Sequence, residues 1–194
     1  MPLGANKAAL FGVAGVSTGS AVLLSTATAS NSASIEFTLP TAYKQVKFGF
    51  YNITPATDAA DFSFQVNASG GSGYNETMTT TVIDVWHNEA DTSAGLAYGS
   101  TYDQAQGTAY QQLSEGTGNG ADECCSGELS LYNPASTVYV KHFTGKMNTY
   151  VSTNLSSNLF PAGYINTTTN LSEIAFKFSS GNISSGTIKM WGIK

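Results

Sequence analysis

The chain contains no arginine, so all eight of its basic residues are lysines. Arginine is the residue that proteins favour for two-point contacts with phosphates and with the edges of bases. The lysines are scattered along a chain whose net charge is −5, whereas nucleic-acid binding draws most of its affinity from a clustered basic surface. We therefore expect no nucleic-acid partner, and no polybasic contact with a membrane.

Charge of either sign is also scarce, at 11% of residues, against about a quarter in typical soluble domains. The polar surface must be built mainly from the hydroxyl and amide groups of serine, threonine and asparagine. Such a surface lacks the charge repulsion that keeps monomers apart. We interpret this composition as that of a protein in an assembly or outside a cell. An ordinary β-rich composition is the alternative.

A long uninterrupted apolar run is missing too. The best candidate, residues 8–24, is broken by glycine, serine and threonine, which makes it too polar for a membrane span. Lys7 before it and the Ala-Thr-Ala sequence at 27–29 give it the outline of a signal peptide. Because the run is so broken, we expect neither a cleaved leader nor membrane insertion.

Residues 1–19 carry few apolar side chains in a background of glycine and alanine. Glycine raises the entropic cost of ordering, and so few side chains offer little burial in return. We expect this segment to be an extended arm that docks on the rest of the chain or on a neighbouring subunit, and residues 20–194 to form a single domain. The expected docking residues are Leu3, Leu10, Phe11 and Val13.

Apolar and polar residues alternate through most of the remaining chain. Val46, Phe48 and Phe50 share one face of a predicted strand, and phenylalanines of the next strand continue the core. Residues 172–194 alternate twice around a Ser-Ser-Gly-Asn turn, which predicts a β-hairpin with one buried face that includes Trp191. The predicted strands are 21–26, 34–39, 43–53, 60–68, 76–87, 95–102, 110–114, 127–133, 137–149, 158–165, 171–179 and 186–193.

Twelve short strands with turn-forming residues between them indicate antiparallel pairing. No stretch after residue 24 has a helical period. The predicted fold is therefore all-β, an antiparallel β-sandwich of jelly-roll type with an extended N-terminal arm.

Asp84, His87, Glu89 and Asp91 lie close together where a predicted strand ends. Carboxylates and an imidazole at near-alternate spacing can share a metal ion or act as an acid–base pair. Alternation alone also places them on a solvated face, and His142 is the only other histidine for a zinc site or a Ser-His-Asp triad. We therefore expect no catalytic residue, metal, cofactor or enzymatic activity.

Cys124 and Cys125 are the only cysteines. Adjacent cysteines rarely bond to each other because the small ring strains the peptide, and alternation sends them to opposite faces. We expect two thiols, or one bridge between subunits. Asp122 and Glu123 offer the oxygen ligands that calcium prefers, but their spacing indicates a solvated loop.

Several aromatic residues fall near predicted loops or strand ends. Aromatic rings stack on apolar faces of sugars, and hydroxyl and amide neighbours can bond sugar hydroxyls. If these rings are exposed, they favour recognition of a carbohydrate or a protein. They are Tyr74, Trp86, Tyr98, Tyr102, Tyr110 and Tyr132.

Both ends of the chain show a resemblance to known proteins. The segment 3–15, LGANKAALFGVAG, resembles the N-termini of virion structural proteins of tailed, particularly marine, bacteriophages. The segment 178–193, FSSGNISSGTIKMWGI, is similar to the closing hairpin of β-sandwich phage proteins. The middle of the chain agrees with that family in character only.

The resemblance implies a non-enzymatic component of the virion, an extracellular particle, bound through its arm to other virion proteins and to copies of itself, with a trimer favoured. It implies a tail-fibre or receptor-binding role, with a host surface glycan as an expected partner. A capsid decoration or head-fibre protein is the nearest alternative. A secreted carbohydrate-binding module and a polysaccharide-degrading enzyme are the others, and the enzyme would need two carboxylates facing one groove.

Overall fold

The computed structural model describes residues 21–194, and the regular secondary structure within them consists of β-strands alone. The expected docking arm, with Leu3, Leu10, Phe11 and Val13, lies outside the described residues. The strands are β1 (Ala21–Thr28), β2 (Ile35–Thr38), β3 (Gln45–Pro55), β4 (Phe62–Ala68), β5 (Met78–Asn88), β6 (Ala94–Tyr98), β7 (Ala105–Gly107), β8 (Gln111–Gln112), β9 (Cys125–Tyr132), β10 (Lys141–Val151), β11 (Leu155–Ile165), β12 (Leu171–Phe178) and β13 (Ile183–Ile193).

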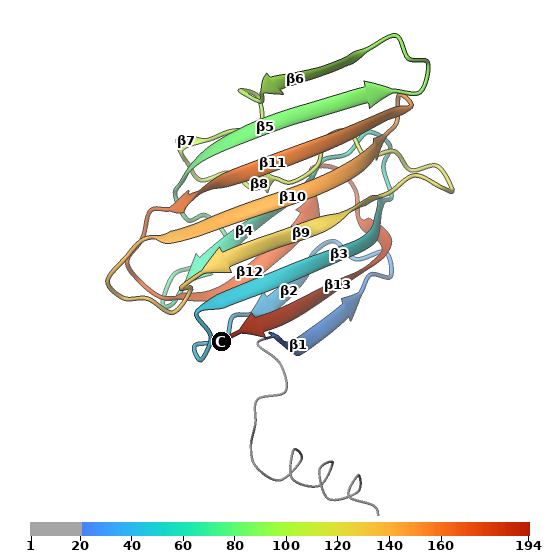
Figure 1. The fold of residues 1–194 in the computed structure, drawn as a ribbon. Coiled ribbons are helices and arrows are strands. Elements are labelled where there is room, and N and C mark those ends of the chain that lie inside the picture. Colours follow the sequence, from blue (N-terminus) through green and yellow to red (C-terminus); the bar gives the residue numbers. More distant parts are fainter. Residues whose placement is uncertain (1–20) are drawn as a thin grey trace, which may run out of the picture.

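The strands form two packed antiparallel sheets, which confirms the predicted all-β sandwich. The larger sheet has nine strands in the order β1-β13-β3-β9-β10-β11-β5-β6, with β7 also paired to β5. The smaller sheet has the order β2-β12-β4-β8. In Figure 1 the larger sheet faces the viewer, the smaller sheet lies behind it, and β1 and β6 form opposite edges of the larger sheet.

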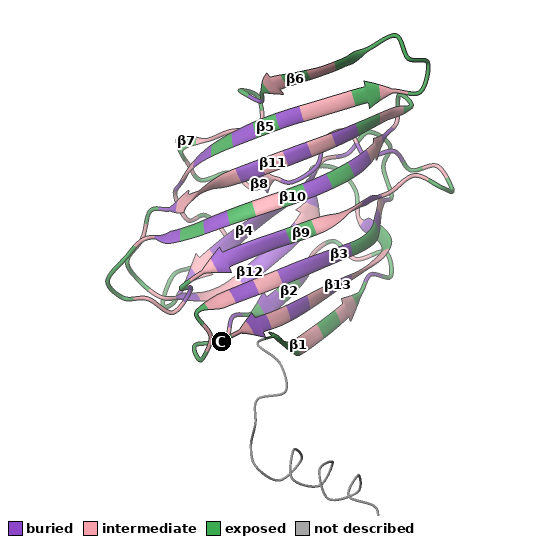
Figure 2. Ribbon diagram, viewed as in Figure 1, coloured by how far each residue is buried: buried purple, intermediate pink, exposed green. Residues whose placement is uncertain are grey.

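Phenylalanine rings fill the space between the two sheets. Phe48 and Phe50 of β3 and Phe62 of β4 are almost completely buried, as the alternation predicts. Phe176 of β12 lies at the centre, with its ring centroid 5.2–6.5 Å from those of five other phenylalanines. Figure 2 shows the same alternation along the strands of the larger sheet, where buried residues are separated by more exposed ones.

The predicted C-terminal hairpin is wrong in its pairing. β12 pairs with β2 and β4, whereas β13 pairs with β1 and β3, so the chain crosses between the sheets after Phe178. Alternation indicates which face of a strand is buried, but not which strand lies beside it. Trp191 directly follows the buried Met190, so its side chain points to the outer face instead of the core.

Several predicted strands are too long, and the one predicted over 110–114 is reduced to Gln111–Gln112. The strand predicted over 95–102 ends at Tyr98, and the one predicted over 137–149 begins only at Lys141. Val138 and Tyr139 alternate correctly but are 67% and 71% exposed in the loop before β10. No neighbouring strand pairs with residues 137–140. An alternating pattern is not enough to form a strand, because the backbone groups of a strand also need hydrogen-bond partners.

Lys141 is the largest charged side chain in the interior and is fully buried at the start of β10. Its ammonium group donates hydrogen bonds to the backbone carbonyls of Thr167 at 3.0 Å and Thr169 at 2.6 Å. Burial lowers its pKa below the ordinary lysine value, and the charge of Glu76 opposes that shift. Lys141 thus fixes the connection between β11 and β12, where the chain passes from the larger sheet to the smaller one.

Candidate functional site

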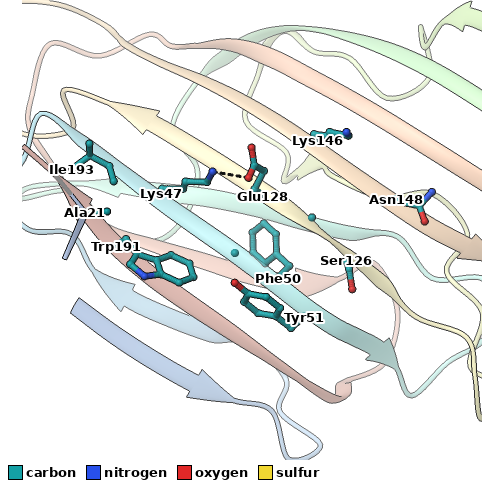
Figure 3. Close-up of a pocket in the computed structure, with 12 residues that line it drawn as sticks. Ala21, Lys47, Phe50, Tyr51, Ser126, Glu128, Lys146, Asn148, Trp191 and Ile193 are labelled. Carbon is teal, nitrogen blue, oxygen red and sulfur yellow. Dashed lines mark ion pairs between the residues drawn. The ribbon is translucent and has the colours of Figure 1, made fainter. Parts of the chain in front are cut away.

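A groove of about 730 Å³ crosses the outer face of the larger sheet. Its lining comes from five strands that lie side by side, β1, β13, β3, β9 and β10. Figure 3 shows Trp191 and Tyr51 on one side of it and Lys146 and Asn148 on the other, with the ion pair of Lys47 and Glu128 between them. The groove therefore offers aromatic, charged and amide groups to one ligand.

Gly49 of β3 lets the aromatic side of the groove form. A Cβ at this position would lie 2.9 Å from Cζ3 of Trp191 and 3.1 Å from the hydroxyl of Tyr51. The indole of Trp191 therefore lies directly on the strand backbone, with the Tyr51 hydroxyl beside it. Tyr51 is 47% exposed, so its ring is available to a ligand.

Polar groups occupy the remainder of the groove. The ammonium of Lys47 lies 2.6 Å from a carboxylate oxygen of Glu128, and both side chains are partly exposed. Lys146 and Asn148 are exposed on the next strand, β10. Ser126 accepts a hydrogen bond of 2.9 Å from the backbone N–H of Asn52. Donors and acceptors of this kind beside aromatic rings can bind sugar hydroxyls while a ring stacks on the apolar face of the sugar.

The carboxylate cluster considered from the sequence is divided by the fold. Asp84 is buried on the inner side of β5, where Ser157 donates a 3.3 Å hydrogen bond to it. His87 lies on the exposed side and contacts Asp91 at 3.2 Å. Across residues 21–194, no group of three or more histidine, cysteine, aspartate or glutamate side chains is placed to hold a metal ion.

The environment of Asp84 predicts that the stability of the protein depends measurably on pH. Burial, and secondarily the charge of Glu115, raise its pKa above the ordinary value, so the folded state disfavours the ionised form. The native protein therefore binds this proton more tightly than the unfolded chain, and the stability cost of the charge appears as the pH rises through the raised pKa. Asp84→Asn should therefore be more stable than the wild type at pH 7.

That advantage of Asp84→Asn should shrink as the pH is lowered toward about 4, the pKa of an unfolded aspartate. Urea unfolding at several pH values measures it. Asp122→Asn is a matched control, because Asp122 is exposed in a loop. An equal effect of both substitutions would contradict a special role for burial at Asp84.

The two cysteines lie on opposite sides of the chain, as alternation predicts. Cys125 is fully buried and Cys124 is partly exposed, and both are free thiols. Burial raises the pKa of Cys125 to about 12, so its thiol stays protonated and unreactive near neutral pH.

The aromatic residues that the sequence places near loops or strand ends are mostly half-buried. Of the six, Tyr98 is exposed, at 56%, while Tyr102 is half-buried and donates a hydrogen bond to Glu115. The side chain of Trp86 packs on Gly95, where a Cβ would lie 2.5 Å from its ring. Tyr51 and Trp191, whose side chains line the groove, were not among them.

A signal for both missed residues was present. Tyr51 directly follows Phe50, so alternation places it on the outer face of its strand. Trp191 stands next to Met190, and adjacent residues of a strand point to opposite faces. Their meeting could not be predicted, because it depends on the pairing of β3 with β13.

In the described part of the chain, no helix has the length and apolar character needed to cross a membrane. Comparison with models of protein families gives no match, and comparison with curated protein sequences gives none either. The function is therefore inferred from the groove and from the resemblance of the chain ends.

Proposed function

We propose that this chain is a non-enzymatic adhesion module of a tailed-bacteriophage particle, of tail-fibre or receptor-binding type, and that its groove binds a surface saccharide. The observation that carries the proposal is the placement of Trp191 and Tyr51 over Gly49, beside exposed polar side chains. The particle itself is proposed from the resemblance of segments 3–15 and 178–193.

The groove is better suited to binding than to hydrolysis. Glycoside hydrolases of the usual type place two carboxylates on either side of the scissile bond. Among the groove residues that the structure describes, Glu128 carries the only carboxylate, and it is paired with Lys47. The groove is also open to solvent and crosses five neighbouring strands, which allows a polymer to lie along it (Figure 3).

We also infer that the sandwich is of jelly-roll type. If the strands β5–β7 and β10–β11 are set aside as insertions, the order β1-β13-β3-β9 faces β2-β12-β4-β8. The strand pair β1/β2 then lies beside β12/β13, followed by β3/β4 and β8/β9. Such a rolled arrangement of two Greek keys defines the jelly roll, which occurs in viral capsid and lectin domains.

A capsid decoration or head-fibre role is the second candidate, and one surface feature favours it. Ile83, Leu96 and Tyr98 are 48%, 73% and 56% exposed near the β6 edge of the larger sheet. Ile83 faces Tyr98 across β5 and β6, so these side chains form an apolar surface of the kind that assemblies cover. Antibody labelling of intact particles distinguishes the roles, because the tail is marked in one case and the head in the other.

Replacing Trp191 tests the proposed binding site. The full chain is titrated calorimetrically with dextran, polygalacturonate and dextran sulfate of similar length. Where a polymer binds, Trp191→Ala should weaken its affinity about tenfold or more, because an aromatic anchor in a binding site typically carries at least that share of the energy. The melting temperature should change little, since the indole lies outside the core.

Tyr139→Ala is the matched control, because Tyr139 is 71% exposed in a loop that does not line the groove. It should leave the affinity unchanged. The proposal fails if none of the three polymers binds, or if Trp191→Ala and Tyr139→Ala bind them equally well.

A further inference from the structure

The charges of the larger sheet are distributed unevenly. The chain has thirteen acidic residues, but the strands of this sheet contain two of them, Asp84 and Glu128. Asp84 is buried on the inner side, which leaves Glu128 as the acidic side chain on the outer face of the strands. The remaining acidic residues lie in loops and in the smaller sheet.

Three lysines lie on this outer face. Lys47 and Lys146 line the groove, and the ammonium of Lys189 lies 5.6 Å from the ring of Tyr51. Glu128 neutralises Lys47. Within residues 21–194, Lys146 and Lys189 form no ion pair. The strands around the groove therefore carry three lysines and one glutamate on their outer face, on a protein whose total charge is −5.

A neutral sugar would not use this charge. Lys146 and Lys189 are not neutralised by an ion pair within residues 21–194, so an anion that approaches them gains electrostatic attraction. Lys146 lies across the ion pair from Trp191 (Figure 3), so a sugar stacked on the indole can direct a charged substituent toward it. Charged hydrogen bonds to carboxylate or sulfate are stronger than neutral ones.

We propose that the ligand of the groove is an anionic saccharide, one of whose carboxylate or sulfate groups contacts Lys146 while a sugar ring stacks on Trp191. This inference rests on the proposed function and adds the chemical class of the ligand. Lys189 contributes to the positive field beside Tyr51, and Lys47 remains paired with Glu128.

The test compares charged and neutral polymers on the full chain. Dextran sulfate and polygalacturonate should bind at least about tenfold more tightly than dextran of the same length at low salt, and the difference should shrink as ionic strength rises. Lys146→Gln should weaken binding of the charged polymers about five- to tenfold and leave dextran unaffected. Binding of one charged polymer but not the other would identify the anionic group and support the proposal.

Lys177→Gln is the matched control. Lys177 lies between the buried Phe176 and Phe178, so it points away from the core on the smaller sheet. It removes the same charge from the protein and should leave all affinities unchanged. An equal effect of Lys146→Gln and Lys177→Gln would show attraction by overall charge and overturn the proposal.

The test separates failure of the proposal from failure of the proposed function. If dextran binds as tightly as the charged polymers and Trp191→Ala weakens all three, the groove is a saccharide site without preference for charge. If no polymer binds, both the proposed function and the anionic class are wrong.

Discussion

Replacement of Phe176 by alanine should lower the free energy of unfolding by about 3–5 kcal/mol. The side chain is fully buried, and its ring packs against five other phenylalanine rings from both sheets. These rings come from strands on both sides of the sandwich, so they cannot move together to fill the cavity without displacing a sheet. For a chain of this length the melting temperature should fall by about 6–20 °C.

Phe160→Ala is the control for Phe176→Ala. Phe160 is half-buried on β11, where its ring lies 5.9 Å from the ammonium of Lys146. It packs outside the space between the sheets, so its loss should cost much less. Urea unfolding of both variants measures the difference, and comparable losses would mean that Phe176 is not at the centre of the core.

Replacement of Lys141 by methionine should cost about 2–5 kcal/mol. Methionine fills most of the volume but leaves the carbonyls of Thr167 and Thr169 without their donor, at about 1–3 kcal/mol each where they are shielded from water. Removal of the buried charge relieves part of this cost, because burial disfavours the ammonium form. The free energy of unfolding and protease cleavage within residues 166–170 measure the effect.

Lys177→Met is the control for Lys141→Met, because it makes the same substitution on the outer face of the smaller sheet. It should lower stability by less than about 1 kcal/mol, because its ammonium lies 4.3 Å from the Tyr110 ring and little else holds it. If Lys141→Met lowered the free energy of unfolding as little as Lys177→Met, the carbonyls of Thr167 and Thr169 would be solvated. Lys141 would then not hold the connection between β11 and β12.

The fold class was predictable because period-two alternation depends on burial alone. Val46, Phe48 and Phe50 were placed in the core from their spacing, and they are 0%, 0% and 1% exposed. The pairing of strands was not predictable in the same way. β12 and β13 are neighbours in sequence and satisfy the pattern of a hairpin. They nevertheless lie in different sheets, where β12 pairs with β2 and β4 and β13 pairs with β1 and β3.

The groove could not be predicted, because it depends on the pairing of strands, which alternation does not determine. Tyr51 and Trp191 are 140 positions apart in sequence, and they meet because β13 inserts between β1 and β3. Lys146 comes from a fourth strand, β10. In contrast, Asp84 and His87 are close in sequence but lie on opposite faces of β5, because three positions along a strand reverse the direction of the side chain.

The insertion of β13 between β1 and β3 has a consequence for synthesis of the protein. On the ribosome, β1 and one side of β3 emerge first and have no partner until residues 183–193 follow. Until then the apolar faces of β3 and β4 are open to water and to other nascent chains. We expect the sandwich to close only after residues 183–193 have left the ribosome, and chains stalled before residue 183 to require a chaperone to remain in solution.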